Sequence, residues 1–195
     1  MLVVSAPSGA GKSTLCQALR GLMPGIRYSV SVTTRTPRSG EQDGRDYHFL
    51  SREKFLKLAR GGKLVEHARV HGHWYGTPKA AFDEAQRDGA DLFLDLDIQG
   101  ARAVKREYPD AVLVFIAPPS MKALEDRLRT RSQDSEAVIR RRLANARREL
   151  KAVPDYDYVI VNDKLSEALD QLRSILVAER RRVSRVRFEA RRVNA

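Results

Sequence analysis

The sequence contains few of the residues on which several classes of protein depend. Its single cysteine, Cys16, cannot form an intramolecular disulfide bond, and no CxxC pair or His/Cys cluster has the spacing of a zinc site. No apolar run approaches the roughly 18 residues that a membrane-spanning helix needs. The basic region and long apolar core of a secretory signal are missing after Met1. We therefore expect a cytoplasmic protein without structural disulfides.

Length and composition predict one folded domain. The chain has 195 residues, of which 42% are hydrophobic and 31% charged, and domains usually contain about 100 to 200 residues. Its formal net charge of +11 suits a polyanionic partner, either a nucleic acid or the phosphates of small nucleotides. Seven arginines and one glutamate in residues 180–195 contribute +6 of that charge. We interpret residues 184–195 as a solvated basic tail.

Short apolar runs and segments with helical spacing alternate along the chain. Runs typical of buried strands cover residues 2–5, 28–32, 92–96, 112–117 and 158–161. Helices are predicted over residues 12–22, 78–87, 99–107, 120–131, 135–153 and 166–182. Because strands and helices alternate, the sequence predicts an α/β fold of three layers with a mainly parallel central sheet.

One stretch interrupts this alternation. Residues 33–77 are rich in Thr, Arg, Gly and Tyr, with strand-like pieces at 47–50 and 64–71 around a helix near 52–60. We interpret this stretch as an inserted subdomain.

A glycine-rich segment lies between the first predicted strand and the first predicted helix. Residues 6–14 read Ala-Pro-Ser-Gly-Ala-Gly-Lys-Ser-Thr, in the context required of a P-loop, which binds phosphates. Gly9 and Gly11 allow the backbone to curl so that its N–H groups point at phosphate oxygens. Lys12 would reach the β- and γ-phosphates of ATP, and Ser13 would offer its hydroxyl to Mg²⁺. The ATP-binding residues predicted in this loop are Ser8, Gly9, Ala10, Gly11, Lys12, Ser13 and Thr14.

The loop departs from the strict GxxxxGK[ST] pattern, because Ala6 occupies the first glycine position. A left-handed backbone at that position would be unfavourable for alanine. The alternative interpretation is a glycine-rich turn with an incidental lysine. The flanking elements and the Gly-x-Gly-Lys-Ser core favour the phosphate loop.

A second signal, an acidic residue at the end of a predicted strand, supports the interpretation of residues 6–14 as a phosphate loop. Residues 91–95 form an apolar strand that ends in Asp95, the Walker-B arrangement that orients the Mg²⁺ shell in P-loop enzymes. Asp97 follows two residues later and lies on the same side if the strand continues. Alternatively, either acid caps the next helix or pairs with a surface arginine.

Several uncommon strings occur in the same order as in one known family. They are Ser-Ala-Pro-Ser-Gly-Ala-Gly-Lys-Ser-Thr at 5–14, Ser-Val-Ser-Val-Thr-Thr-Arg-Thr-Pro-Arg at 29–38, Gly-Arg-Asp-Tyr at 44–47, Tyr-Gly-Thr at 75–77 and Leu-Asp-Leu-Asp-Ile-Gln-Gly at 94–100. The pattern continues through residues 115–120 and 159–163. With these strings the chain strongly resembles guanylate kinase over nearly its whole length, leaving only the basic tail outside the pattern.

The resemblance implies an ATP:GMP phosphotransferase with a P-loop core, a GMP-binding subdomain and a helical lid. The core would comprise residues 1–32, 78–120 and 146–183, the GMP-binding insertion 33–77 and the lid 121–145. The implied substrates are ATP and GMP with Mg²⁺ as cofactor, and neither a nucleic acid nor a membrane is required.

The resemblance also implies individual roles by motif match. The GMP-binding residues would be Ser31, Arg35, Arg38, Tyr47, Glu66, Tyr75, Thr77 and Asp97, with Arg35, Arg38, Tyr47 and Tyr75 on the phosphate and Ser31, Glu66 and Thr77 facing guanine. Asn162 falls where the family approaches the adenine of ATP. The implied catalytic set is Lys12, Arg38, Arg127, Arg131 and Arg142, and Ser13 with Asp95, the latter through water, would serve the metal.

The chemistry of phosphoryl transfer agrees with this assignment. The second pKa of a phosphate monoester is near 6, so the attacking oxygen of GMP is largely deprotonated at pH 7 and needs no general base. Catalysis then requires in-line positioning and neutralisation of charge, which lysine, Mg²⁺ and arginines supply. The four histidines, His48, His67, His71 and His73, are accordingly interpreted as structural or surface residues.

Two other classes of function compete with this interpretation. A nucleic-acid-binding module would explain the net charge but not a P-loop and a Walker-B strand in one chain. A catalytically inactive scaffold of the same family should have lost the phosphate-loop chemistry, whereas Lys12 and Ser13 are present.

Overall fold

The computed structural model describes residues 1–23, 25–38, 40–70, 72–131 and 135–186, and its centre is a parallel sheet of five strands. Across the sheet the strands are β2 (Ile26–Tyr28), β7 (Asp91–Asp95), β1 (Leu2–Ser5), β8 (Val112–Ala117) and β9 (Tyr158–Val161). Every pairing in this sheet is parallel. The predicted α/β class is confirmed, and four of the five predicted strands agree with the observed bounds to within one residue.

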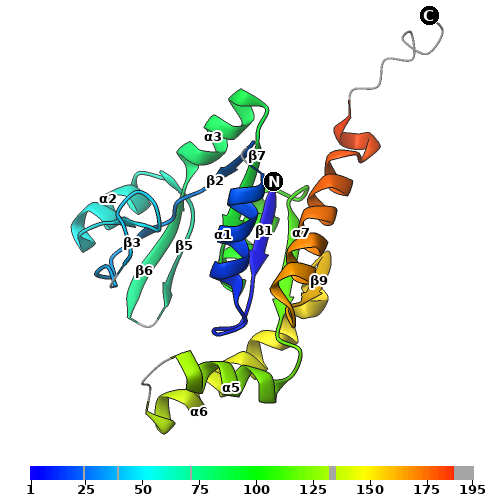
Figure 1. Ribbon diagram of the computed structural model, residues 1–195. Helices are drawn as coiled ribbons and strands as arrows, with labels where there is room; N and C mark the ends of the chain where they lie inside the picture. Colours follow the sequence, from blue (N-terminus) through cyan, green and yellow to red (C-terminus); the bar gives the residue numbers. More distant parts are fainter. Residues whose placement is uncertain (24, 39, 71, 132–134, 187–195) are drawn as a thin grey trace, which may run out of the picture.

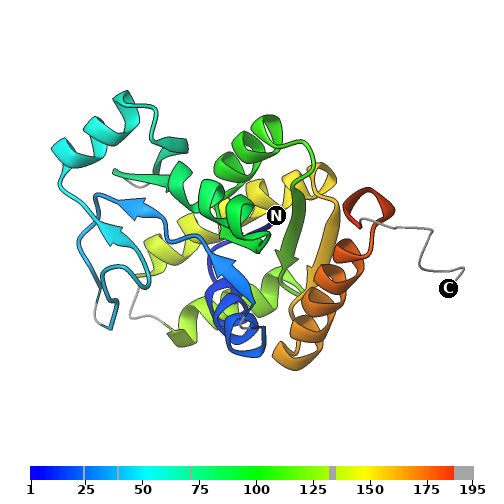
Figure 2. The same ribbon diagram turned by 90° about the horizontal axis from the view of Figure 1, so that it is seen from above.

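Helices cover both faces of this sheet (Figure 2). On one face α1 (Lys12–Leu22) and α7 (Leu165–Arg180) form a hydrophobic cluster with strand residues that include Leu2 and Val4. On the other face α3 (Lys79–Asp88) and α4 (Ile98–Glu107) form a second cluster that includes Val3. Successive side chains of a strand point to opposite faces. The uninterrupted apolar run of β1 therefore supplies both clusters, as expected of a strand covered on both sides.

A second, four-stranded sheet lies beside the first (Figure 1). Its order is β4 (His48–Phe49), β3 (Val32–Thr33), β6 (His73–Pro78) and β5 (Leu64–Val70), with α2 (Arg52–Arg60) beside it. Phe55 of α2 is fully buried in a small cluster with Val32 and Leu64. This sheet occupies most of the stretch interpreted as an insertion.

The predicted strand at 28–32 is wrong, because the chain changes sheets within it. Tyr28 ends β2 of the first sheet, and the N–H of Ser29 still donates to the carbonyl of Phe93 at 2.9 Å. Val32 then begins β3, and its side chain joins the small cluster of the second sheet. An apolar run shows that its residues are buried but not in which of two neighbouring cores.

Strand β6 was not predicted from the sequence. Its residues, His73–Pro78, combine aromatic residues with a glycine and a proline, a composition that weakens a strand signal. The structure explains the glycine: a Cβ at Gly76 would lie 2.8 Å from Leu64 Cδ1 and 3.0 Å from the carbonyl oxygen of Glu66. Close approach of β5 to β6 therefore requires glycine at this position.

Two further helices, α5 (Met121–Arg131) and α6 (Glu136–Glu149), lie together at the end of the central sheet toward which β1 points (Figure 1). They share a cluster of their own, formed by Leu124, Leu128, Ile139, Leu143 and Ala146. The helix predicted over 135–153 is shorter than expected, because the 3₁₀ helix η1 (Leu150–Asp155) follows α6 and contains Pro154. Proline cannot donate the backbone hydrogen bond that would continue an α-helix.

The described start of the predicted basic tail, residues 184–186, is exposed as expected, but Arg185 also contacts the folded domain. Arg185, in the 3₁₀ helix η2 (Val183–Arg185), lies 2.8 Å from the carboxylate of the buried Glu179 and donates to the carbonyl of Asp110 at 2.8 Å. Residues 187–195 of the predicted tail lie outside the described residues. Within the described part of the chain, no helix is long and apolar enough to cross a membrane.

Removing a large side chain from the central core should cost much of the stability. Phe93, 1% exposed, lies in β7 and stacks on Tyr28 at 5.8 Å. We expect Phe93→Ala to lower the free energy of unfolding by about 3–5 kcal/mol, since the cavity is only partly refilled. Leu22→Ala, at a position that is 58% exposed, should change it by less than about 0.5 kcal/mol. Urea denaturation of both variants measures the difference, and equal losses would contradict the assignment of the core.

Candidate active site

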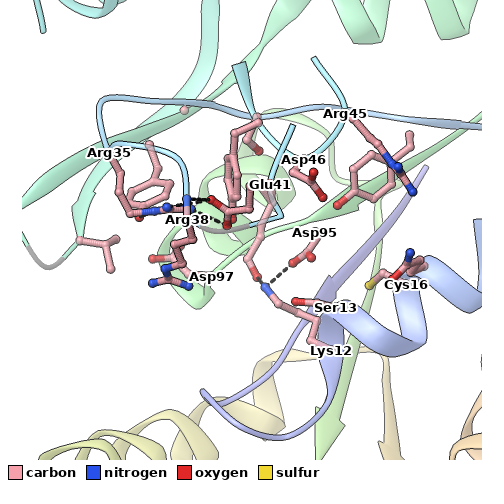
Figure 3. A pocket seen from close by; sticks show the side chains of 18 of the residues that line it. Lys12, Ser13, Cys16, Arg35, Arg38, Glu41, Arg45, Asp46, Asp95 and Asp97 are labelled. Atoms are coloured by element: carbon pink, nitrogen blue, oxygen red, sulfur yellow. Dashed lines mark hydrogen bonds and ion pairs between the residues drawn. The ribbon is translucent and has the colours of Figure 1, made fainter. Parts of the chain in front are cut away.

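A cavity of about 680 Å³ lies between the two sheets, at the carboxyl end of the central strands. Ligands of open α/β sheets commonly bind at this end. The predicted site residues that line it are Lys12, Ser13, Ser31, Arg35, Arg38, Tyr47, Glu66, Tyr75, Asp95 and Asp97. The cavity thus brings residues from the phosphate loop, the acidic strand and the insertion to one place (Figure 3).

The glycine-rich loop has the backbone of a phosphate loop. Gly9 and Gly11 adopt φ angles of +91° and +89°, which other L-residues rarely adopt. Gly11 is the N-cap of α1, so the positive end of that helix faces the loop. Ala6, at the first pattern position, is partly buried and packs against the larger core cluster. The methyl group that distinguishes Ala6 from the glycine of the pattern therefore packs against the hydrophobic core.

Lys12 and Asp95 form an ion pair across the base of the cavity (Figure 3). Lys12 Nζ also donates to the carbonyl of Leu96 at 3.0 Å. Burial alone would lower the pKa of Lys12, but the charge and hydrogen bond of Asp95 outweigh burial and raise this pKa to about 12. The ammonium group is therefore permanently charged at neutral pH.

The two acids of the predicted Walker-B strand have different partners. Asp95 pairs with Lys12, whereas Asp97 is the N-cap of α4 and its Oδ1 accepts a hydrogen bond from the N–H of Gly100 at 2.8 Å. The capping alternative raised from the sequence thus describes Asp97. Capping uses only one of its carboxylate oxygens, and Asp97 still lines the cavity.

A cationic cluster faces Lys12 from the insertion (Figure 3). The guanidinium group of Arg35 donates to both carboxylate oxygens of Glu41, at 2.9 and 2.8 Å, and its Nε donates to the hydroxyl of Tyr75 at 3.2 Å. The backbone N–H of Arg38 donates to the same carboxylate at 2.7 Å. Glu41 therefore fixes both arginine positions, and the bond from Arg35 is the main cause that lowers the pKa of Glu41.

Aromatic rings support this cluster. The rings of Tyr47 and Tyr75 meet edge to face at 5.9 Å, and the guanidinium carbon of Arg35 lies 5.4 Å from the centre of the Tyr47 ring. Such cation–π contacts restrict the orientation of a guanidinium group. Sequence reasoning missed Glu41, although an acid six residues after Arg35 in an arginine-rich loop was a usable signal.

Glu66 is a carboxyl group in an environment that disfavours its charge. It pairs with Thr77 between β5 and β6, and the Thr77 hydroxyl donates to Glu66 Oε1 at 2.7 Å. Burial raises the pKa of Glu66, the hydrogen bond from Thr77 lowers it, and the charge of Asp97 raises it again, so that it reaches about 7. The group sits poised between its two protonation states, as functional carboxyl groups often do.

Other predicted residues lie outside the lining of the cavity. Ser8, Gly9, Ala10, Gly11 and Thr14 form the loop and the first turn of α1 behind Lys12, and Thr77 contacts the cavity residue Glu66. Asn162 follows β9, and its side-chain amide donates to the carbonyl of Ala10 at 2.7 Å. Arg127 of α5 donates to the carbonyls of Asn162 and Asp163.

The remaining two lid arginines are placed differently. Arg142 lies in α6 and is partly buried away from the cavity lining. Arg131 is the last residue of α5, and its side chain lies outside the part that the structure describes.

None of the described histidines lines the cavity. His67 packs against the rings of Phe55 and Trp74, at 6.3 and 5.7 Å, as a structural residue does. His48 and His73 belong to strands of the second sheet, and His71 lies outside the described residues.

Comparisons with known proteins identify the relatives of this chain. Residues 1–179 match the family model described as guanylate kinase. A guanylate kinase of Syntrophotalea carbinolica is 50% identical over 193 residues, which cover 99% of this chain and 92% of that protein. One from Desulfitobacterium hafniense is 49% identical over 95% of this chain and 92% of its own length. The crystal structure of guanylate kinase from Anaplasma phagocytophilum superimposes with a TM-score of 0.79 at 38% identity, covering 95% of this chain and 88% of that one.

The pKa of Glu66 yields a prediction about stability. A folded-state pKa of about 7, raised from 4.5, means that the native state binds more protons than the unfolded state between these values, so stability falls as pH rises through this window. Glu66→Gln removes the ionisation and keeps an acceptor for Thr77. We expect the variant to be more stable than the parent at pH 8, by up to about 3 kcal/mol, with most of this gain absent at pH 5.

Denaturant unfolding at the two pH values measures this gain. Glu53→Gln, the same change at an exposed helix position, should change the free energy of unfolding only slightly, and by the same amount at pH 5 and pH 8. A gain for Glu66→Gln that did not depend on pH would show that the carboxyl group is not held near neutrality.

Proposed function

The chain belongs to the guanylate kinase family, and from this premise we propose how its residues transfer the γ-phosphoryl group of ATP to GMP. The reaction gives ADP and GDP, and the enzyme class is the nucleoside monophosphate kinases. One observation carries the residue assignments: a single cavity joins a phosphate loop with its lysine to a cationic cluster and a buried carboxyl group on the opposite sheet. This is the arrangement that a donor triphosphate and an acceptor monophosphate need to meet in line.

On the donor side, we assign the triphosphate of ATP to residues 8–14. The left-handed turns at Gly9 and Gly11 curl the backbone of this loop, and α1 begins directly behind it. Backbone N–H groups and a helix N-terminus together form an anion site. Lys12 then contacts the β- and γ-phosphates after exchanging its partner Asp95 for phosphate oxygens.

The residues present fit Mg²⁺. Ser13 and Asp95 both line the cavity next to Lys12, and hydroxyl and carboxylate oxygens are the donors that Mg²⁺ prefers. Among the described residues there is no group of three or more His, Cys, Asp or Glu side chains that could hold a metal ion, and Mg²⁺ bound with a nucleotide is usually held mostly by phosphates and water. We propose that Ser13 binds Mg²⁺ directly and Asp95 through water. When bound, the ion neutralises charge on the phosphates.

On the acceptor side, we assign the phosphate of GMP to Arg35, Arg38, Tyr47 and Tyr75. Arginines suit a phosphate because their planar donors match its oxygens in pairs. The carboxylate of Glu41 holds Arg35 and the backbone of Arg38 in place without the phosphate. A charged group that is already oriented loses less freedom when the ligand binds.

The guanine base is assigned to Ser31, Glu66, Thr77 and Asp97. The Watson–Crick edge of guanine offers the neighbouring donors N1–H and N2–H₂, and an ionised carboxylate only accepts. Glu66 can therefore take both donors. Since Thr77 gives its proton to Glu66, we propose that Ser31 donates to O6 of guanine.

Transfer needs no protein base in this scheme. The phosphate of GMP is largely deprotonated at pH 7, and no described histidine lines the cavity. The protein aligns the two phosphates and offsets negative charge with Lys12, Arg38 and the lid arginines Arg131 and Arg142. We propose a core at 1–32, 78–120 and 146–183, an acceptor subdomain at 33–77 and a lid at 121–145.

Lys12→Ala should remove most of the catalysis while the protein stays folded. The variant loses a charge that stabilises the transition state, and we expect kcat to fall by about a hundredfold or more. A coupled assay of ADP formation from ATP and GMP measures this, with circular dichroism as the test of folding. Lys54→Ala on α2, at an exposed position, is the control. Near-normal turnover of Lys12→Ala would contradict the assignment of the phosphate loop.

Glu66→Ala should affect the acceptor alone. We expect kcat/KM for GMP to fall by at least about tenfold, with little change in the Kd of ATP, because the lost contacts belong to guanine. Adenine presents an acceptor at N1 and donors at N6, which is the reverse pattern, so the parent should reject AMP. Assays with GMP, AMP, CMP and UMP test this selectivity. If Glu66→Ala used GMP as well as the parent and still excluded AMP, another residue would be the guanine reader.

A further inference from the structure

The side chain of Asn162 is packed against the phosphate loop. The residue is 6% exposed, and its amide Nδ2 donates to the carbonyl oxygen of Ala10 at 2.7 Å. A Cβ added to Gly11 would lie 2.4 Å from the same Nδ2. The amide therefore occupies the space beside Gly11 that any side chain there would need.

This hydrogen bond determines the direction of one peptide group. In a trans peptide the C=O of one residue and the N–H of the next point in opposite directions. The Ala10 carbonyl points to Asn162, so the N–H of Gly11 points away from Asn162. Convergent N–H groups are what a phosphate loop offers its ligand. By binding the Ala10 carbonyl, Asn162 thus orients the N–H of Gly11, although Asn162 is not itself part of the loop.

Asn162 is itself held in position by two neighbours. Its backbone N–H donates to the carbonyl of Ala117 at 2.8 Å. The guanidinium group of Arg127 donates to the carbonyls of Asn162 and Asp163, at 2.9 and 3.2 Å. One planar side chain therefore bridges two consecutive peptide groups at the end of β9.

The helix that carries Arg127 also touches the loop directly. A Cβ at Gly9 would lie 2.8 Å from Leu128 Cδ2 and 3.1 Å from Leu124 Cδ1, both on α5. The part of the loop that precedes Lys12 is thus packed against α5 at Gly9 and against Asn162 at Gly11.

We propose that Asn162 is a positioning residue of the phosphate loop, held by Arg127, and that it acts on the triphosphate through the backbone of residues 10–11 rather than through the base of ATP. The proposal rests on the function proposed above, because it concerns the same donor site. It also gives Arg127 a role that does not require contact with the transferring phosphate.

Inorganic tripolyphosphate separates the two roles of Asn162, because it carries the phosphates of ATP without the base. With Mg²⁺ present, Asn162→Ala should raise the Kd of ATP and of tripolyphosphate alike, each by about tenfold, since the lost hydrogen bond orients the loop for both. The Kd of GMP should stay within about twofold, which also shows that the variant is folded. Isothermal titration with the three ligands measures these constants. Weaker ATP binding with unchanged tripolyphosphate binding would mean that Asn162 contacts the base, and would overturn the proposal.

Asn162→Asp provides a second variant of the same shape. It replaces the donor by a carboxylate oxygen that faces the Ala10 carbonyl, so tripolyphosphate binding should weaken more than in Asn162→Ala. Equal or tighter binding would overturn the proposal. Because these titrations involve no turnover, they test the positioning role even if the parent failed to phosphorylate GMP, an outcome that would contradict only the proposed function.

The role of Arg127 is tested by a double-mutant cycle. If Arg127 acts through Asn162, then adding Arg127→Ala to Asn162→Ala should change the Kd of tripolyphosphate by less than about twofold beyond the single variant. Additive losses would assign Arg127 to the phosphates and remove it from the proposal. Arg129→Ala, two residues along α5, is the matched control, because Arg129 pairs with the surface residues Glu125 and Glu136. It should leave the Kd unchanged.

Discussion

The parallel pairing of β1 with β7 brings Asp95 next to Lys12, and most of the site is arranged around this ion pair. The register pairs Val4 with Asp95, so β7 ends in a carboxylate where β1 turns into the loop that leads to Lys12. Because β1 contributes side chains to both core clusters, a shift of this strand would disturb close packing on both faces of the sheet. The stability of the central sheet and the geometry of the charged pair are therefore set by the same packing.

The second sheet and its loops form the side of the cavity that faces the phosphate loop. Antiparallel pairing of β5 with β6 puts Glu66 opposite Thr77, and the loop before β4 brings Arg35 and Glu41 to the same cavity. These side chains bind one another through charged hydrogen bonds, whereas the fully buried Phe55 anchors the sheet by apolar contact. The residues proposed to bind the acceptor and the residues that support the sheet are thus different ones.

The sequence was sufficient to predict the central sheet, its helices and the phosphate loop, because buried parallel strands are continuous apolar runs and the loop has a fixed spacing of glycines. It was insufficient where the result depends on contacts between distant residues. The run at 28–32 is divided between two cores, and β6 has the composition of a turn. The pairing of Arg35 with Glu41 and of Asn162 with Ala10 joins residues whose side chains meet only after folding. The family resemblance suggested the acceptor residues, which remain proposals, while the structure added the contacts that hold them.

Under the proposed role of Glu66, its raised pKa makes the binding of guanine depend on the pH of the solution. With a pKa of about 7, roughly half of the molecules carry a neutral carboxylic acid at that pH. In the proposed assignment guanine presents two donors to the ionised form of Glu66, so each neutral molecule would release its proton when guanine binds. Binding heat would then vary with the ionisation enthalpy of the buffer. On the same assignment, protons would compete with guanine for the Glu66 carboxylate, so that a fall in pH would weaken the binding of GMP.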